Sequence, residues 1–152
     1  MHLAHYLALL ERSQSNLADA FRAVARGHSD DADVHLLCQK LARQCDVHAE
    51  QLSPFATRYG HDAPAEPERL HGAPFDGTRE GGLGLLRDLH DLYLMACECD
   101  IVWTLVGQAA QGARDRELLE LVQSCEGETA TQVAWLAGRM KEAAPQALVV
   151  AS

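Results

Sequence analysis

The order of helical segments and connections constrains the fold of this 152-residue chain more than any other feature. Apolar residues recur every three or four positions, as on one face of an α-helix, over about 3–26, 31–59, 82–111 and 115–144. A few residues join the first two segments and the last two, so each pair is expected to form an antiparallel hairpin. The sequence therefore predicts an all-α four-helix bundle, a single domain over 1–152.

The connection over about 60–80 decides the topology. It contains Pro64, Pro67, Pro74, Gly72 and Gly77 and has no hydrophobic period. A helix of about 27 residues is roughly 40 Å long, and about twenty extended residues reach roughly 66 Å. The connection can therefore cross the whole bundle and leave the second and third helices parallel. A connection folded locally would instead give an up-down-up-down bundle.

Composition excludes several classes of function. Leu and Ala dominate the apolar residues, and the aromatic fraction of 5% favours helices over a β-sandwich. A net charge of −9 argues against binding to nucleic acid or to an anionic membrane surface. The five cysteines are odd in number and lie within helical stripes, so we expect reduced thiols and a cytoplasmic protein.

Chemically capable side chains fall on two of the predicted core stripes. Cys45 and His48 lie one turn apart on the second helix, and Cys125 and Glu128 lie one turn apart on the fourth. Reflection of each hairpin about its turn places all four near mid-length, level with Ser13 or Gln14 on the first helix and Cys97 and Cys99 on the third. Imidazole, thiolate and carboxylate groups in one layer are typical of a transition-metal site.

This arrangement resembles the ferritin-like superfamily, in which a long crossover joins two helical hairpins and Glu-x-x-His pairs bind two metal ions. Cys45-x-x-His48 and Cys125-x-x-Glu128 stand where those pairs would be, and Glu11 and Glu98 lie near the remaining positions. The chain has no intact Glu-x-x-His. The resemblance therefore implies the fold, and a degenerate metal centre in place of a ferroxidase.

Simpler interpretations remain open for each residue. Buried free cysteines commonly act as small hydrophobic side chains. His48 can be a core histidine that is hydrogen-bonded to Ser13, Gln14 or Glu128. Thr129 can take the inward position on the fourth helix and leave Glu128 exposed. Asp88, His90 and Asp91 are expected on the solvated side of the third helix, and a set of six histidines is expected at the surface: His2, His5, His28, His35, His61 and His71.

Three functions follow as hypotheses. The first is metal handling or stress response, as the resemblance implies, with iron, zinc or copper bound by His48, Cys45, Glu128 and Cys125. The second is a metal-free structural or protein-interaction bundle that acts as an oligomer. The third, less favoured, is a redox sensor, which would need an exposed thiol of low pKa.

Neither a catalytic residue set nor an organic cofactor is indicated. The Gly-rich start of the third helix, Gly81-Gly82-Leu83-Gly84, has no preceding strand to make it a nucleotide site. The broad apolar girth of the third helix and the Ala-Leu-Val-Val segment after Pro145 predict a homodimer or larger homo-oligomer.

Overall fold

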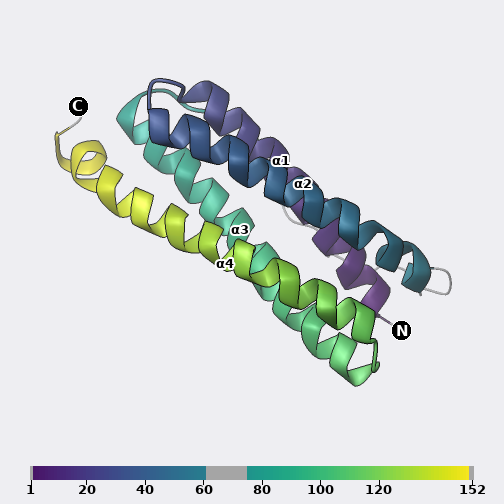
Figure 1. Cartoon of the computed structure of the whole chain (residues 1–152). Helices are drawn as coiled ribbons and strands as arrows, with labels where there is room; N and C mark the ends of the chain where they lie inside the picture. Colours follow the sequence, from purple (N-terminus) through teal and green to yellow (C-terminus); the bar gives the residue numbers. More distant parts are fainter. Residues whose placement is uncertain (1, 61–74, 151–152) are drawn as a thin grey trace.

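The computed structural model describes residues 2–60 and 75–150, and these form the predicted four-helix bundle (Figure 1). The helices are α1 (Leu3–Gly27), α2 (Ala32–Gly60), α3 (Gly81–Gly112) and α4 (Arg116–Pro145), followed by a π-helical turn, η1 (Gln146–Val150). Each helix boundary agrees with its predicted position to within about one residue, and no strand occurs in the described ranges.

The helices form two antiparallel hairpins, α1–α2 and α3–α4, and α2 and α3 run parallel. At one end of the bundle, Arg58 near the end of α2 bonds Asp115 at the start of α4. At the opposite end, His28 after α1 bonds Asp88 in the first turns of α3, with 2.7 Å between Nε2 and Oδ2. Since α2 ends at the first end and α3 begins at the second, the crossover topology is confirmed. The predicted loop residues 61–74 lie outside the described residues.

Close packing after the crossover fixes the start of α3 against α1. A Cβ placed on Gly27 would lie only 2.6 Å from Oγ1 of Thr78, so a larger residue at this position would force the two segments apart. Asp88 is completely buried, and its carboxylate accepts bonds from the backbone N–H of Arg79 at 2.9 Å and from Arg79 Nη1 at 2.7 Å. The expectation that Asp88 and His28 would be solvated is therefore wrong, because the two side chains pair with each other in the interior. His5, which was also expected at the surface, is buried as well.

The chain ends differently from the prediction at one point. The fourth helix was expected to stop just before Pro145, yet α4 includes this residue and continues directly into η1. Proline cannot donate the backbone bond that an α-helix needs, so a change of winding at this point is physically reasonable. The turn buries Ala147 and exposes Leu148, Val149 and Val150.

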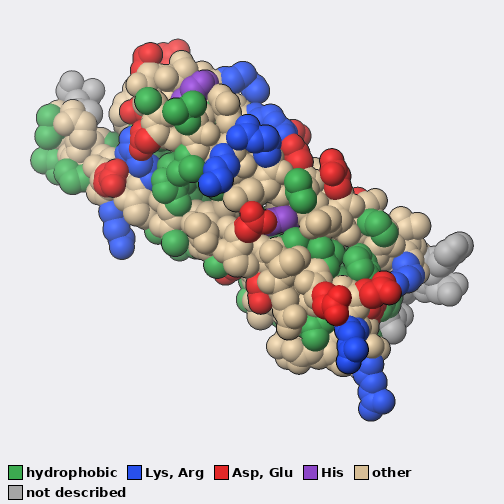
Figure 2. Space-filling view, viewed as in Figure 1, with side chains coloured by type: hydrophobic (Ala, Val, Ile, Leu, Met, Phe, Trp, Pro, Cys, Tyr) green, Lys and Arg blue, Asp and Glu red, His purple; other side chains and the backbone are tan. Residues whose placement is uncertain are grey.

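The core runs along the centre of the bundle and consists mainly of Leu, Val and Ala, with Phe21 and Trp103 as its largest side chains. The hairpins meet chiefly where α1 packs on α3, whereas α2 and α4 approach less closely. No helix in the described part of the chain combines the length and hydrophobicity needed to cross a membrane. The face seen in Figure 2 carries acidic and basic side chains intermixed.

Candidate functional site

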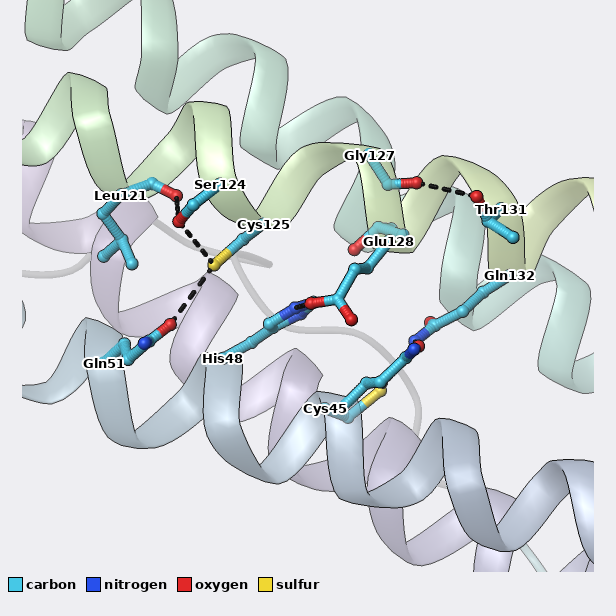
Figure 3. A network of polar contacts seen from close by, with 12 residues as sticks. Cys45, His48, Gln51, Leu121, Ser124, Cys125, Gly127, Glu128, Thr131 and Gln132 are labelled. Carbon is cyan, nitrogen blue, oxygen red and sulfur yellow. Dashed lines mark hydrogen bonds and ion pairs between the residues drawn. The ribbon is translucent and has the colours of Figure 1, made fainter.

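Polar side chains line the seam between α2 and α4 at mid-length, and they pair across it (Figure 3). His48 and Glu128 point toward each other, with 3.0 Å between Nε2 and Oε1. On one side of this pair Cys125 faces Gln51, and on the other Cys45 faces Gln132. We call these residues the α2–α4 seam. The backbones of α2 and α4 lie too far apart to pack closely, and these side chains bridge the distance between them.

His48 is the central side chain of the seam. Its side chain is 1% exposed, and its ring meets the indole of Trp103 edge-on with 5.7 Å between centroids. Burial lowers the pKa of His48 below its ordinary 6.5, and the contact with Glu128 opposes this shift only in part. A neutral ring donates Nε2–H to the carboxylate, which leaves Nδ1 as a buried acceptor without a partner among the described residues.

Glu128 and Thr129 share the position that the sequence left undecided. Thr129 is completely buried and accepts a bond from the indole N–H of Trp103 at 3.1 Å. The side chain of Glu128 is 46% exposed, yet its carboxylate reaches back over the buried imidazole. Both alternatives are therefore partly right: Thr129 points inward, and Glu128 is the hydrogen-bond partner of His48.

The four buried cysteines are predominantly protonated core groups. Burial raises the pKa of Cys45 to about 12, and burial is also the main reason why the pKa values of Cys99 and Cys125 lie above the ordinary value. The Sγ atom of Cys45 lies 3.7 Å from Gln132 Oε1, and that of Cys125 lies 3.5 Å from Gln51 Oε1. All five cysteines are free. Cys97 is half-buried, apart from the seam.

The four predicted ligands do not converge on one point. Cys45 and Gln51 are six positions apart on α2, which corresponds to about 9 Å along the helix. Since Cys125 contacts Gln51, the two thiols lie on opposite sides of the His48–Glu128 pair, whereas two sulfurs bound to one zinc ion lie within about 4.6 Å of each other. Within residues 2–60 and 75–150, no three His, Cys, Asp or Glu side chains are grouped closely enough to hold a metal ion.

A second polar group at this level is Gln14 on α1. It is completely buried, and neither its amide nitrogen nor its oxygen has a partner among the described residues. Burial of an unpaired amide costs about 1–3 kcal/mol. The sequence identified Gln14 as a candidate for this layer, and the structure confirms that it faces the core.

The protonation of His48 gives a testable pH dependence. The unfolded chain takes up a proton near pH 6.5, whereas the folded chain resists it, so the unfolded state binds more protons as the pH falls. We expect the free energy of unfolding to decrease between pH 7 and pH 5, and His48→Gln to reduce that decrease. Urea unfolding at several pH values measures this. His90→Gln, at an exposed histidine of α3, is the control, and equal slopes for wild type and His48→Gln would contradict the assignment.

The helix order is the one that the ferritin-like resemblance implies. The kinship itself remains a prediction, because helical bundles of this topology arise in unrelated proteins as well. Comparison of the chain with protein-family models, with curated proteins and with solved structures gives no match.

Proposed function

We propose that this protein is a metal-free helical-bundle module that acts through association at its surface. The pairing within the α2–α4 seam is the observation that carries the proposal. His48 is bonded to Glu128, and each seam thiol faces a glutamine amide, so the predicted ligands already have protein partners. Side chains satisfied in this way stabilise a bundle and fix the register of its helices.

The protonation state of the thiols favours this function over metal binding or redox chemistry in the core. A nucleophilic or metal-binding cysteine acts as a thiolate. Burial raises the pKa of Cys38 and Cys45 to about 12, which keeps them protonated at neutral pH. The same burial disfavours a redox-sensing role for these two residues. Free thiols in the core are also consistent with the cytoplasmic location that we propose.

Metal handling is the second candidate, and one feature favours it. His48 and Glu128 place a neutral imidazole beside a half-exposed carboxylate, which are two donor types that zinc and iron accept. Nδ1 of His48 and the amide of Gln14 are buried without described partners. The residues present nevertheless do not fit the predicted four-ligand centre, since the thiols lie on opposite sides of the pair. A metal bound by His48 and Glu128 would have two protein ligands.

Elemental analysis of untagged protein, purified without chelator, separates the two candidates. We expect less than about 0.1 iron, zinc or copper per chain, because a two-ligand site binds these ions weakly. The thermal midpoint should be the same with and without EDTA, since metal release would otherwise remove binding energy from the folded state.

Two variants make the result specific. His48→Ala removes the imidazole of the seam, and His90→Ala removes an exposed imidazole on α3. Near-stoichiometric metal in wild type and in His90→Ala, lost in His48→Ala together with a chelator-sensitive melting temperature, would overturn the metal-free proposal and establish metal binding.

A further inference from the structure

The outer face of α3 carries four large hydrophobic side chains that the bundle does not cover. Leu83, Leu94, Ile101 and Leu105, here called the α3 stripe, are 48%, 57%, 54% and 45% exposed. Their separations of eleven, seven and four positions keep them on one side of a helix. From Leu83 to Leu105 the stripe is about 33 Å long. An aligned apolar strip of this length is typical of a helix that packs against another helix.

A hydrophobic groove adjoins each end of the stripe, one toward α1 and the other toward α4. The groove toward α1 includes Tyr6, Leu105 and Ala109, and the groove toward α4 includes Tyr93 and Met140. The apolar surface is therefore wider than the four stripe residues alone. A partner helix lying along α3 can place side chains in both grooves, as ridges-into-grooves packing requires.

Charged and polar residues within the same face indicate which partner fits it. Arg87 and His90 lie in the half of α3 nearer its start, and Glu98 lies in the other half. A second copy packed parallel would oppose Arg87 with Arg87 and Glu98 with Glu98. A second copy packed antiparallel brings the basic half against the acidic half. The face is therefore complementary to itself in one orientation, as a two-fold symmetric interface must be.

We infer that a second copy of this chain docks antiparallel on the α3 stripe, with Leu94 on the two-fold axis. In this register Leu83 faces Leu105 of the other copy, and His90 faces Glu98. Arg87 lies beside Ile101 and within one turn of Glu98, which its long side chain can reach. The inference rests on the proposed function, association through the surface, and names its partner and its orientation.

A register shifted to place the axis between Cys97 and Glu98 is less favourable. It sets Leu83 against Gly112 at the end of the helix and His90 against Leu105, and it removes the pairing of basic with acidic residues. The two registers differ in which cysteines could cross-link. Cα atoms joined by a disulfide are usually 4.4–6.8 Å apart, and each register brings a different position within that distance of its symmetry mate.

Sedimentation equilibrium over a range of protein concentrations tests the interface. We expect wild type to dimerise and Leu94→Arg to weaken dimerisation about 100-fold or more, since it opposes two unpaired cations at the centre of an apolar contact. Leu36→Arg is the matched control, because Leu36 is 64% exposed on α2 and outside the stripe. Wild type that is monomeric throughout, or equal dimerisation of the two variants, overturns the inference. Circular dichroism checks that each variant is folded.

Cross-linking tests the register. Under mild oxidation, Leu94→Cys in a Cys97→Ser background should form a covalent dimer, whereas the same background with Leu36→Cys should not. Wild type should not cross-link through Cys97, because the two Cys97 residues would be about 9 Å apart along the paired helices. Efficient cross-linking of wild-type Cys97 would overturn the Leu94-centred register.

Exchange of the charges at positions 87 and 98 tests the antiparallel orientation. The metal content of the dimeric and monomeric proteins distinguishes failure of this inference from failure of the proposed function. Glu98→Arg should weaken dimerisation by about 10-fold, and Arg87→Glu in the same chain should restore it. Failure of this rescue overturns the antiparallel pairing. Stoichiometric metal in the dimeric wild type and in monomeric Leu94→Arg would instead reject the metal-free proposal and leave the dimer interface intact.

Discussion

Replacement of Trp103 by alanine is expected to lower the free energy of unfolding by about 3–5 kcal/mol, the range typical of large-to-small substitutions at buried aromatic residues. Trp103 is completely buried and is among the largest side chains of the core. Its indole N–H donates to Thr129 Oγ1 at 3.1 Å, and its ring packs edge-on against His48. The substitution therefore leaves a cavity, an unpaired hydroxyl and a less constrained imidazole at once. Urea unfolding followed by circular dichroism measures the loss.

Trp103→Phe is the matched control for this prediction. Phenylalanine retains much of the apolar volume but cannot donate to Thr129, so we expect a smaller loss, about 1–3 kcal/mol. A loss below about 1 kcal/mol for Trp103→Ala would mean that the core closes around the gap, and the central role assigned to this side chain would then be incorrect.

Removal of the buried carboxylate at position 88 is the second large effect. Asp88→Ala is expected to cost about 3–5 kcal/mol, because it leaves the buried ring nitrogen of His28 and the backbone N–H of Arg79 without their acceptor, and each buried polar group left unpaired costs about 1–3 kcal/mol. Asp88 is bonded to His28, to the backbone N–H of Arg79 and to the Arg79 guanidinium. These contacts join the end of α1, the residue before α3 and α3 itself. Thermal unfolding should show a lower midpoint by about 10 °C.

Asp91→Ala is the control for Asp88→Ala, because it removes a carboxylate that contacts the same arginine from an exposed position. Asp91 also contacts the Arg79 guanidinium, at 2.9 Å, but its side chain is 40% exposed. Exposed ion pairs contribute about 0–1 kcal/mol, so this variant should be nearly as stable as wild type. Similar losses for Asp88→Ala and Asp91→Ala would show that the effect comes from the Arg79 charge alone.

The fold was predictable from local signals. Hydrophobic spacing located all four helices, and the structure caps the fourth with Asp115, whose carboxylate accepts from the backbone N–H of Leu118 at 3.0 Å. The lengths of the connections allowed the parallel α2–α3 arrangement but did not require it. The choice depended on contacts between residues far apart in sequence, such as His28 with Asp88, and no local pattern specifies such contacts.

The seam was predicted in outline but not in its pairing. Periodicity placed Cys45, His48 and Cys125 in the core, and all three are buried. It could not show that each thiol would face a glutamine. Gln132 falls on the core-facing stripe of the fourth helix, three positions after Thr129, but spacing alone does not pair it with Cys45, and Gln51 lies off the stripe of the second helix. An error of one position also interchanges Glu128 with Thr129, since adjacent residues lie about 100° apart around a helix.

The Asp88 cluster was missed although the sequence contained a signal. Asp88 lies three positions after Leu85 and four before Leu92, so it falls on the apolar stripe of its helix. A carboxylate in such a position needs a buried partner. That partner, His28, lies in a turn without helical periodicity, and sequence spacing alone offered no reason to connect the two residues.

The looser approach of α2 and α4 has a consequence for motion. The two hairpins are joined firmly along α1 and α3, whereas on the opposite side the contact consists largely of long side chains. The α1–α3 packing therefore holds the two hairpins together, and the hydrogen bonds His48–Glu128 and Gln132–Gln44 close the opposite side of the bundle. Because α2 and α4 pack less closely than α1 and α3, we expect α2 and α4 to separate more readily than the other helix pairs, which would expose the buried imidazole to water.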